Sequence, residues 1–211
     1  MDVGNDLLSV VSVDVLAVRY DPVRETVRLA IPRRTRDPFA GVPSLPGVVL
    51  QSGERLAEAA GRALAKFTSS APCALGQLTT FDEPNRDPRG PSLSVAMFAV
   101  LPDLDPDIAV RLDEKVPALG FDHEHIIATC RPLLADRLWR DIAFTGALLP
   151  DPFSTRDARA VVVALTGEEP HPGNLNRLLD GLPGIRKTGQ TSAGRGRPTT
   201  LRSLGARPTA G

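Results

Sequence analysis

A polar loop in the first half of the chain carries side chains suited to bind a phosphorylated sugar. The segment EPNRDPRGP contains Arg86, Asp87 and Arg89 close together. Guanidinium groups form forked pairs with phosphate oxygens, and a carboxylate accepts hydrogen bonds from ribose hydroxyls. Arg33 and Arg34, at the end of a predicted strand, add charge that could reach the same ligand. The pattern predicts a sugar-phosphate site, and the alternative is a solvated, salt-bridged loop.

A second group of residues, near the end of the chain, has the chemistry of DNA recognition. Residues 171–211 hold seven basic side chains against one acid, Asp180, which gives +6 in a chain of net charge zero and leaves −6 on residues 1–170. A basic end on an acidic body is typical of a chain that contacts phosphate at one end. A disordered basic tail and a helical hairpin for protein contact are the alternatives.

In a helix-turn-helix, the second helix offers side chains near its start to base edges, where Asn pairs with adenine and Arg with guanine. Basic side chains around that helix serve phosphates or the minor groove. The candidates for DNA contact are Arg156, His171, Asn174, Asn176, Arg177, Arg186, Lys187, Arg195 and Arg197.

No other constellation predicts a metal site, a cofactor or a covalent mechanism. The DHEH stretch places His123 and His125 two positions apart, and a helix points such side chains away from each other. Cys73 and Cys130 form no CxxC pattern, which excludes a zinc ribbon or a disulfide scaffold. No apolar run approaches the roughly 18 residues of a membrane span, so we expect a soluble, cytoplasmic protein.

Apolar periodicity predicts the elements that would position these residues. We expect a helix from Glu54 to Phe67, a helical stretch over 122–145 in which Pro132 starts a new segment, and a linker at LLPDP. The chain then divides near residue 146. The predicted strands are 8–20, 26–32, 74–81 and 92–101, the predicted loop is 37–53, and helices at 154–166 and 174–182 precede a basic, Gly-rich hairpin.

The stretch from Phe39 to Phe67 resembles the loop and helix of Nudix hydrolases. In that family LPGG opens a signature of G, five residues, E, seven residues and then R-E-U-x-E-E-x-G-U, where U is apolar. The residues that fit are Leu45, Pro46, Gly47, Glu54, Arg62 and Leu64. Those that depart are Val48 and Ser69 at glycine positions, and Ala63, Lys66 and Phe67 at the three glutamate positions.

These departures bear on catalysis. Cleaving a nucleoside diphosphate needs Mg²⁺ to neutralise the pyrophosphate and activate a water, and Mg²⁺ requires clustered carboxylates. Only Glu54 and Glu58 persist in this area, and Lys66 adds a cation. The resemblance therefore implies a Nudix-like fold that is not an enzyme and uses no metal or cofactor.

Two further motifs narrow the resemblance to one Nudix branch. The pattern F-x-x-P-x-R-D-P-R-G is matched by Phe81, Pro84, Arg86, Asp87, Pro88, Arg89 and Gly90, and LGFDHEHII is similar to A-F-D-H-x-x-I. That branch is the Nudix-related transcriptional regulators of NAD metabolism (NrtR family), whose ligand is ADP-ribose or a related nucleotide. The ligand-binding residues that the resemblance and the loop chemistry together predict are Arg33, Arg34, Gly47, Glu54, Arg86, Asp87 and Arg89.

The end of the chain resembles the winged helix-turn-helix of those regulators. Their L-P-x-x-F-T-L-R-x-L opening and G-R-P-x-x-L-Y wing strand are matched by Phe153, Arg156, Gly196, Arg197, Pro198 and Leu201, with Arg202 in place of Tyr. Ser154 is a predicted helix N-cap, with Asp157 three residues on.

We therefore expect an α+β protein: a Nudix-like α/β/α sandwich over residues 1–145 that senses the nucleotide, and a winged helix-turn-helix over 146–211 that binds DNA. The resemblance implies a homodimeric repressor on a palindromic operator of NAD biosynthesis or salvage genes. The alternatives are a Nudix pyrophosphatase with an accessory basic tail and a noncatalytic Nudix scaffold for protein partners.

Overall fold

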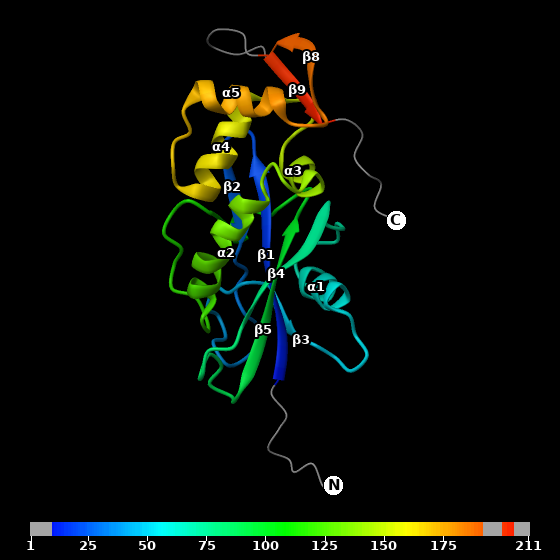
Figure 1. Ribbon diagram of the computed structural model, residues 1–211. Helices are drawn as coiled ribbons and strands as arrows, with labels where there is room; N and C mark the ends of the chain where they lie inside the picture. The colour runs from blue at the N-terminus through cyan, green and yellow to red at the C-terminus, as the bar shows by residue number, and fades with distance from the viewer. Residues whose placement is uncertain (1–9, 192–199, 205–211) are drawn as a thin grey trace.

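A mixed sheet lies at the centre of the computed structural model, which describes residues 10–191 and 200–204 (Figure 1). Its strand order is β4-β5-β1-β2-β6, and β3 also pairs with β1. The strands are β1 (Val10–Asp21), β2 (Thr26–Ala30), β3 (Gly47–Val49), β4 (Ala74–Phe81), β5 (Ser92–Val100) and β6 (Ala109–Arg111). Strand β1 runs parallel to β5 and antiparallel to β2 and β3. Segments far apart in the sequence therefore meet along β1.

The buried residues of β1 divide between two apolar clusters, one on each face of the sheet. Because successive side chains of a strand point to opposite faces, Val13 and Val15 pack with α1 (Leu56–Leu64), while Leu16 and Val18 pack with α2 (His123–Arg137). The sheet is thus covered on both faces, and the predicted α/β/α sandwich is confirmed.

Helix α2 shows where one expectation was wrong. Pro132 lies inside the helix and does not start a new segment. Proline removes one intrahelical hydrogen bond, but the buried side chains Ile127, Cys130 and Leu134 hold the helix against the sheet on both sides of it. The break comes later, where Trp139 adopts a positive φ of 73°, and α3 (Ile142–Leu148) follows.

Helix α1 is also shorter than its apolar stripe predicted. It ends at Leu64, and Phe67 packs against the same apolar cluster from beyond the helix end. Residues 37–53, expected to be loop, contain the short strand β3.

The last quarter of the described chain is a winged helix. An antiparallel sheet of order β7-β9-β8 is formed by β7 (Phe153–Ser154), β8 (Ile185–Thr191) and β9 (Thr200–Leu204). Two helices, α4 (Thr155–Thr166) and α5 (Pro172–Gly181), lie between β7 and β8 in the chain. The predicted N-cap is confirmed, since Ser154 Oγ accepts from the Asp157 N–H at 3.2 Å and Asp157 accepts from the Ser154 N–H at 2.8 Å.

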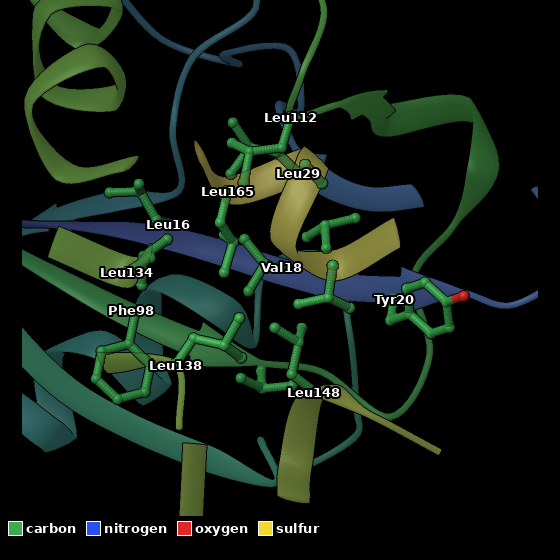
Figure 2. Packing of buried hydrophobic residues seen from close by; sticks show 14 of the residues in the cluster. Leu16, Val18, Tyr20, Leu29, Phe98, Leu112, Leu134, Leu138, Leu148 and Leu165 are labelled. Atoms are coloured by element: carbon green, nitrogen blue, oxygen red, sulfur yellow. The ribbon is translucent and has the colours of Figure 1, made fainter. Parts of the chain in front are cut away.

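One hydrophobic cluster joins the winged helix to the sandwich (Figure 2). Leu165 of α4 lies in the same cluster as Leu29 of β2 and Leu112, and Leu148 of α3 lies in it as well. Figure 1 shows α4 stacked beyond α2, next to β2. Among the described residues, no helix is long and apolar enough to cross a lipid bilayer.

Candidate nucleotide and nucleic-acid sites

A buried polar network lies beneath the loop of Leu45, Pro46 and Gly47, called the Nudix-like loop below. Asp14 of β1 accepts a hydrogen bond from Ser94 Oγ at 2.6 Å, and its carboxylate also faces His123 Nε2 at 3.5 Å and Arg86 Nη2 at 3.6 Å. Arg86 donates to both oxygens of Asp122, at 3.0 and 2.8 Å. The Arg86 side chain is only 4% exposed, so this loop arginine holds the fold together from inside.

The loop itself is anchored to this network. The Leu45 N–H donates to His123 Nδ1 at 2.9 Å, so Nδ1 carries no proton and Nε2–H faces Asp14. Gly47 packs so closely on Asp14 that an added Cβ would lie 2.2 Å from Oδ1. Burial alone would raise the pKa of Asp14, but hydrogen bonds from His123 and Ser94, with the Arg86 charge, hold it below its ordinary value. Gly47 is therefore required by packing on an ionised, buried carboxylate.

The outer part of the RDPRG loop presents a cation to solvent, beside the half-buried ring of Phe121. Arg89 is 52% exposed and makes a bidentate contact with Asp87, with Nη2 to Oδ2 at 2.6 Å. The guanidinium groups of Arg34 and Arg89 lie 4.6 and 5.6 Å from the centre of the Phe121 ring. Phe39 meets that ring edge-on at 4.9 Å. Cations and π faces together suit the phosphates and base of a nucleotide.

Arg33 and Arg34 diverge. Arg34 is partly buried and donates to the Pro38 carbonyl at 2.8 Å, while Arg33 is exposed and donates to the Gly41 carbonyl at 2.8 Å. Burial and the nearby Arg89 charge lower the pKa of Arg34. Of these two arginines, only Arg34 contacts the Phe121 ring together with Arg89.

The signature helix offers no carboxylate cluster for Mg²⁺. Both oxygens of Glu54 accept from Arg62, at 2.8 and 2.7 Å, and this pairing lowers the Glu54 pKa. Glu58 accepts from the Arg55 N–H at 2.9 Å. Ala63 is buried under the sheet, and Phe67 packs beside it. Within 10–191 and 200–204, no group of three or more His, Cys, Asp or Glu could hold a metal ion. The donor set does not fit the Mg²⁺ that a Nudix hydrolase requires.

Lys66 stands at one of the glutamate positions and turns toward the loop. Its Nζ donates to the Gly47 carbonyl at 2.8 Å. Desolvation, with the charges of Arg62, Arg34 and Arg36, lowers its pKa. The spot where the family's glutamates would gather holds a cation instead.

The DHEH stretch is likewise not a shared metal site. His123 is buried in the network described above, whereas His125 is exposed and lies 3.1 Å from Glu83. Glu124 accepts from the Leu119 N–H at 3.0 Å. The two imidazoles point apart, as their spacing predicts.

Helix α5 presents a polar face to solvent. Asn174 and Arg177 are exposed on it, and His171 is the exposed N-cap residue. Leu175 and Leu179 are buried on the opposite face. Arg186 and Lys187 lie exposed on the adjoining strand β8, and Lys187 pairs with Asp180 at 2.8 Å. This surface has the chemistry that base edges and phosphates require.

Asn176 and Arg156, two other candidates for DNA contact, are engaged within the protein. Asn176 Oδ1 accepts from Thr155 at 2.9 Å and from Arg202 at 3.1 Å, which ties α5 to α4 and β9. Arg156 forms an ion pair with Glu25 from the β1–β2 turn. Arg195 and Arg197 lie outside the described residues.

Sequence reasoning missed the residue at the centre of the winged helix. Arg202 stands where the family motif has Tyr, and its side chain is 4% exposed. It donates to Asp180 at 2.8 Å, to Thr155 at 2.8 Å and to Asn176. The departure from the motif was the available signal, because a charge replacing an aromatic inside a small module needs partners. Phe39, Phe121 and Tyr20 were missed as well. Phe39 and Phe121 lie in the two motifs that resemble the Nudix branch, which was the available signal, whereas Tyr20 ends an apolar strand pattern like any core aromatic.

Tyr20 connects the sheet to the winged helix. Its hydroxyl donates to Asp157 Oδ1 at 2.8 Å, and Asp157 also completes the N-cap of α4. Burial and the Asp157 carboxylate raise the Tyr20 pKa, so the hydroxyl keeps the proton that it donates.

Known proteins share this architecture. NrtR from Shewanella oneidensis, solved in complex with a 27mer DNA, superposes with a TM-score of 0.74 and 24% identity, over 92% of this chain and 93% of that one. A MutT/nudix family protein from Enterococcus faecalis superposes with a TM-score of 0.70 and 18% identity, over 94% of this chain and 89% of the other. No protein-family model matches the sequence.

A curated relative matches about half of the chain by sequence. An ADP-ribose pyrophosphatase from Methanocaldococcus jannaschii is 30% identical over 109 residues, 47% of this chain. The matched region spans 63% of that relative's length. Taken with the superpositions, the chain has over nearly all its length the fold of Shewanella oneidensis NrtR, a Nudix-like sandwich joined to a winged helix.

Proposed function

We propose that this protein is a DNA-binding transcriptional regulator whose Nudix-like domain binds ADP-ribose or a related nucleotide without hydrolysing it. The observation that carries the proposal is the likeness, over 92% of the chain, to a protein solved on DNA. In this division, residues 1–145 bind the nucleotide and 146–211 bind DNA. The repressor role and the NAD biosynthesis or salvage genes come from the resemblance of the sequence motifs.

The winged helix supports the DNA-binding half of this proposal. Helix α5 exposes Asn174 and Arg177, and β8 exposes Arg186 and Lys187. The half-buried Asn176 and the buried Arg202 are hydrogen-bonded to each other behind α5, so the exposed face is held in one orientation. We assign Asn176 and Arg156 to positioning this module, and the exposed residues to DNA.

The surface around Phe121 supports the nucleotide half. Arg34 and Arg89 supply charge for phosphates, and the Phe39 and Phe121 rings supply apolar faces for a base. We assign Arg86 to positioning this loop from inside the fold, because its guanidinium is spent on Asp122 and Asp14.

The test uses the full chain at physiological salt. Genomic fragments retained by the purified protein are sequenced, and the affinity for the recovered site is then measured during titration with ADP-ribose. We expect preference for one sequence over a scrambled duplex and a change in DNA affinity as ADP-ribose is added. Equal affinity for both duplexes would leave a scaffold for protein partners as the better account.

A second candidate function is pyrophosphatase activity on ADP-ribose, favoured by the name of the curated relative. Against it stand Ala63, Lys66 and Phe67 at the glutamate positions and the Arg62 pairing of Glu54. Release of AMP from ADP-ribose with Mg²⁺, at about 1 per second or above, would establish this second function in place of binding without turnover.

A further inference from the structure

The cationic cluster beside the Nudix-like loop contains more positive charge than its carboxylates balance. The cluster consists of Arg34, Arg36, Arg62, Lys66 and Arg89. Arg62 is paired with Glu54 and Arg89 with Asp87. Within the described residues, Arg34, Arg36 and Lys66 form no ion pair with a carboxylate. Asp14 acts electrostatically on Arg34 and Lys66, but that carboxylate is buried and already faces Arg86 and His123. Such a surface is complementary to an anion.

Lys66 is the member of this cluster that occupies a metal-ligand position of the signature. An ammonium group has three donors. One of them is used on the Gly47 carbonyl at 2.8 Å, which fixes the charge beside the loop. No second partner of Nζ occurs in the part of the chain that the structure describes. Two donors therefore stay available to anionic oxygens.

The other signature positions in and around α1 do not gather the carboxylate oxygens that a metal needs, and Glu58 of the helix accepts from the Arg55 N–H. The oxygens of Glu54 are taken by Arg62, Ala63 lies under the sheet, and Phe67 packs on the apolar cluster. Mg²⁺ brought next to Lys66, Arg34 and Arg36 would also meet like charges. A divalent cation normally neutralises the oxygens of a diphosphate. Here positively charged side chains are in place to do this instead.

We propose that the Lys66 ammonium takes the place of the divalent cation, so that this chain binds the diphosphate group of a nucleoside diphosphate without any metal. A diphosphate diester carries one negative charge on each phosphoryl group, which Lys66 and Arg34 can balance together. The inference rests on the proposed ligand class but makes a separate claim about how the diphosphate is held.

The test measures binding by the full chain to ADP-ribose and to inorganic pyrophosphate, each in EDTA and in Mg²⁺, by calorimetry. We expect ADP-ribose affinity in EDTA to lie within about threefold of that in Mg²⁺. Lys66→Met should weaken both ligands in EDTA by about 10- to 100-fold, the ratio of a lost charge-assisted hydrogen bond. Lys66→Arg keeps the charge and should stay near the parent affinity. Lys115→Met, the same change at an exposed lysine of another loop, should have no effect.

Three results would overturn the inference: a requirement for Mg²⁺, unchanged affinity of Lys66→Met, or no pyrophosphate binding in EDTA. These are distinguishable from failure of the proposed function. If ADP-ribose binds only with Mg²⁺, the proposal of a nucleotide-binding regulator would still hold, and only the proposed role of Lys66 would be wrong. The protein could also bind pyrophosphate through Lys66 without metal and fail to bind ADP-ribose. That result would support the anion site but contradict ADP-ribose as the effector.

Discussion

The two arginines of the RDPRG loop have different roles although they lie close in sequence. Arg86 is buried against Asp14 and Asp122, whereas Arg89 is half exposed beside Phe121. Removing one partner from a buried ion pair strands the other charge away from water, and removing an exposed partner does not. Stability and ligand binding should therefore separate between these residues.

Arg86→Met should lower the free energy of unfolding by about 3–5 kcal/mol. Arg89→Met should cost less, about 1–3 kcal/mol, because the Arg89 guanidinium is half exposed, although the buried Asp87 carboxylate loses a hydrogen-bond partner. Urea unfolding measures both, and calorimetry should show ADP-ribose affinity reduced only for Arg89→Met among variants that stay folded. Equal stability of the two variants would contradict the burial of Arg86.

Under the proposed function, Arg177 and Arg186 should contact DNA in different ways. Arg177, on the exposed face in the middle of α5, should read a base edge, so Arg177→Ala is expected to cost about 1–3 kcal/mol on the operator and relax preference at one base pair per half-site. Arg186, on β8, should contact phosphate, so Arg186→Ala is expected to weaken all sequences alike and flatten the salt slope by about 0.9. The wing motif of the sequence predicts the same loss for Arg197→Ala.

Affinity for operator and scrambled duplex across a salt series separates the two roles. If Arg177→Ala loses both duplexes equally, the arginine touches phosphate and α5 does not enter the groove as proposed.

At the residue scale, the sequence predicted types of chemistry better than partners. Arg86, Asp87 and Arg89 were grouped correctly as neighbours in one loop, but their alternation along the chain could not say which side chain turns inward. That depends on Asp122 and Asp14, which lie far away in sequence and come together only when β1 meets the start of α2.

Single elements were predictable where their periodicity was strong. The strand over 74–81 matches β4 at both ends, and the Ser154–Asp157 cap marks the start of α4. Strand β3 could not be predicted, because three residues carry no periodic signal and its pairing with β1 is a long-range event. Pro132 gave a clear local signal for a helix break, but the break does not occur there because packing of α2 on the sheet outweighs that local preference.

The link between β1 and α4 gives a prediction at the element scale. Tyr20→Phe keeps the ring in the cluster of Figure 2 and removes only the hydroxyl that bonds Asp157. We expect a coupling free energy of about 0.5–1.5 kcal/mol in a double-mutant cycle with Asp157→Ala, measured by urea unfolding. We also expect Tyr20→Phe to reduce the effect of ADP-ribose on DNA affinity.

Phe81→Leu is the matched control for this cycle, because it alters an aromatic of the same cluster that lies outside the β1–α4 contact. A coupling of zero between Tyr20 and Asp157 would show that the hydrogen bond transmits nothing between strand and helix.

The whole molecule was predictable largely through its motifs. The pairing of a Nudix-like sandwich with a winged helix follows from the LPG, RDPRG and terminal segments, and the superposition on NrtR confirms that fold. How the two parts meet was not predictable, because the contact between α4 and β2 depends on which face of each element is apolar in three dimensions.

One winged helix offers a small surface to DNA, and this leads to a prediction about assembly. We expect a homodimer that binds paired half-sites about one helical turn apart on a palindromic operator. Sedimentation at micromolar protein, with and without operator, tests this, and altering the half-site spacing by about half a turn should abolish tight binding. A monomeric mass under both conditions would falsify the expectation.

The hydrophobic cluster that runs from the sheet into α4 also determines how the protein could be taken apart. Cutting the chain after α3 would leave Leu29 and Leu112 uncovered on one piece and Leu165 on the other. The winged helix could therefore not be transferred to another protein by itself. A chimera that carries the winged helix would also need the apolar surface of β2. In related chains, the residues at the positions of Leu29, Leu112 and Leu165 should vary together.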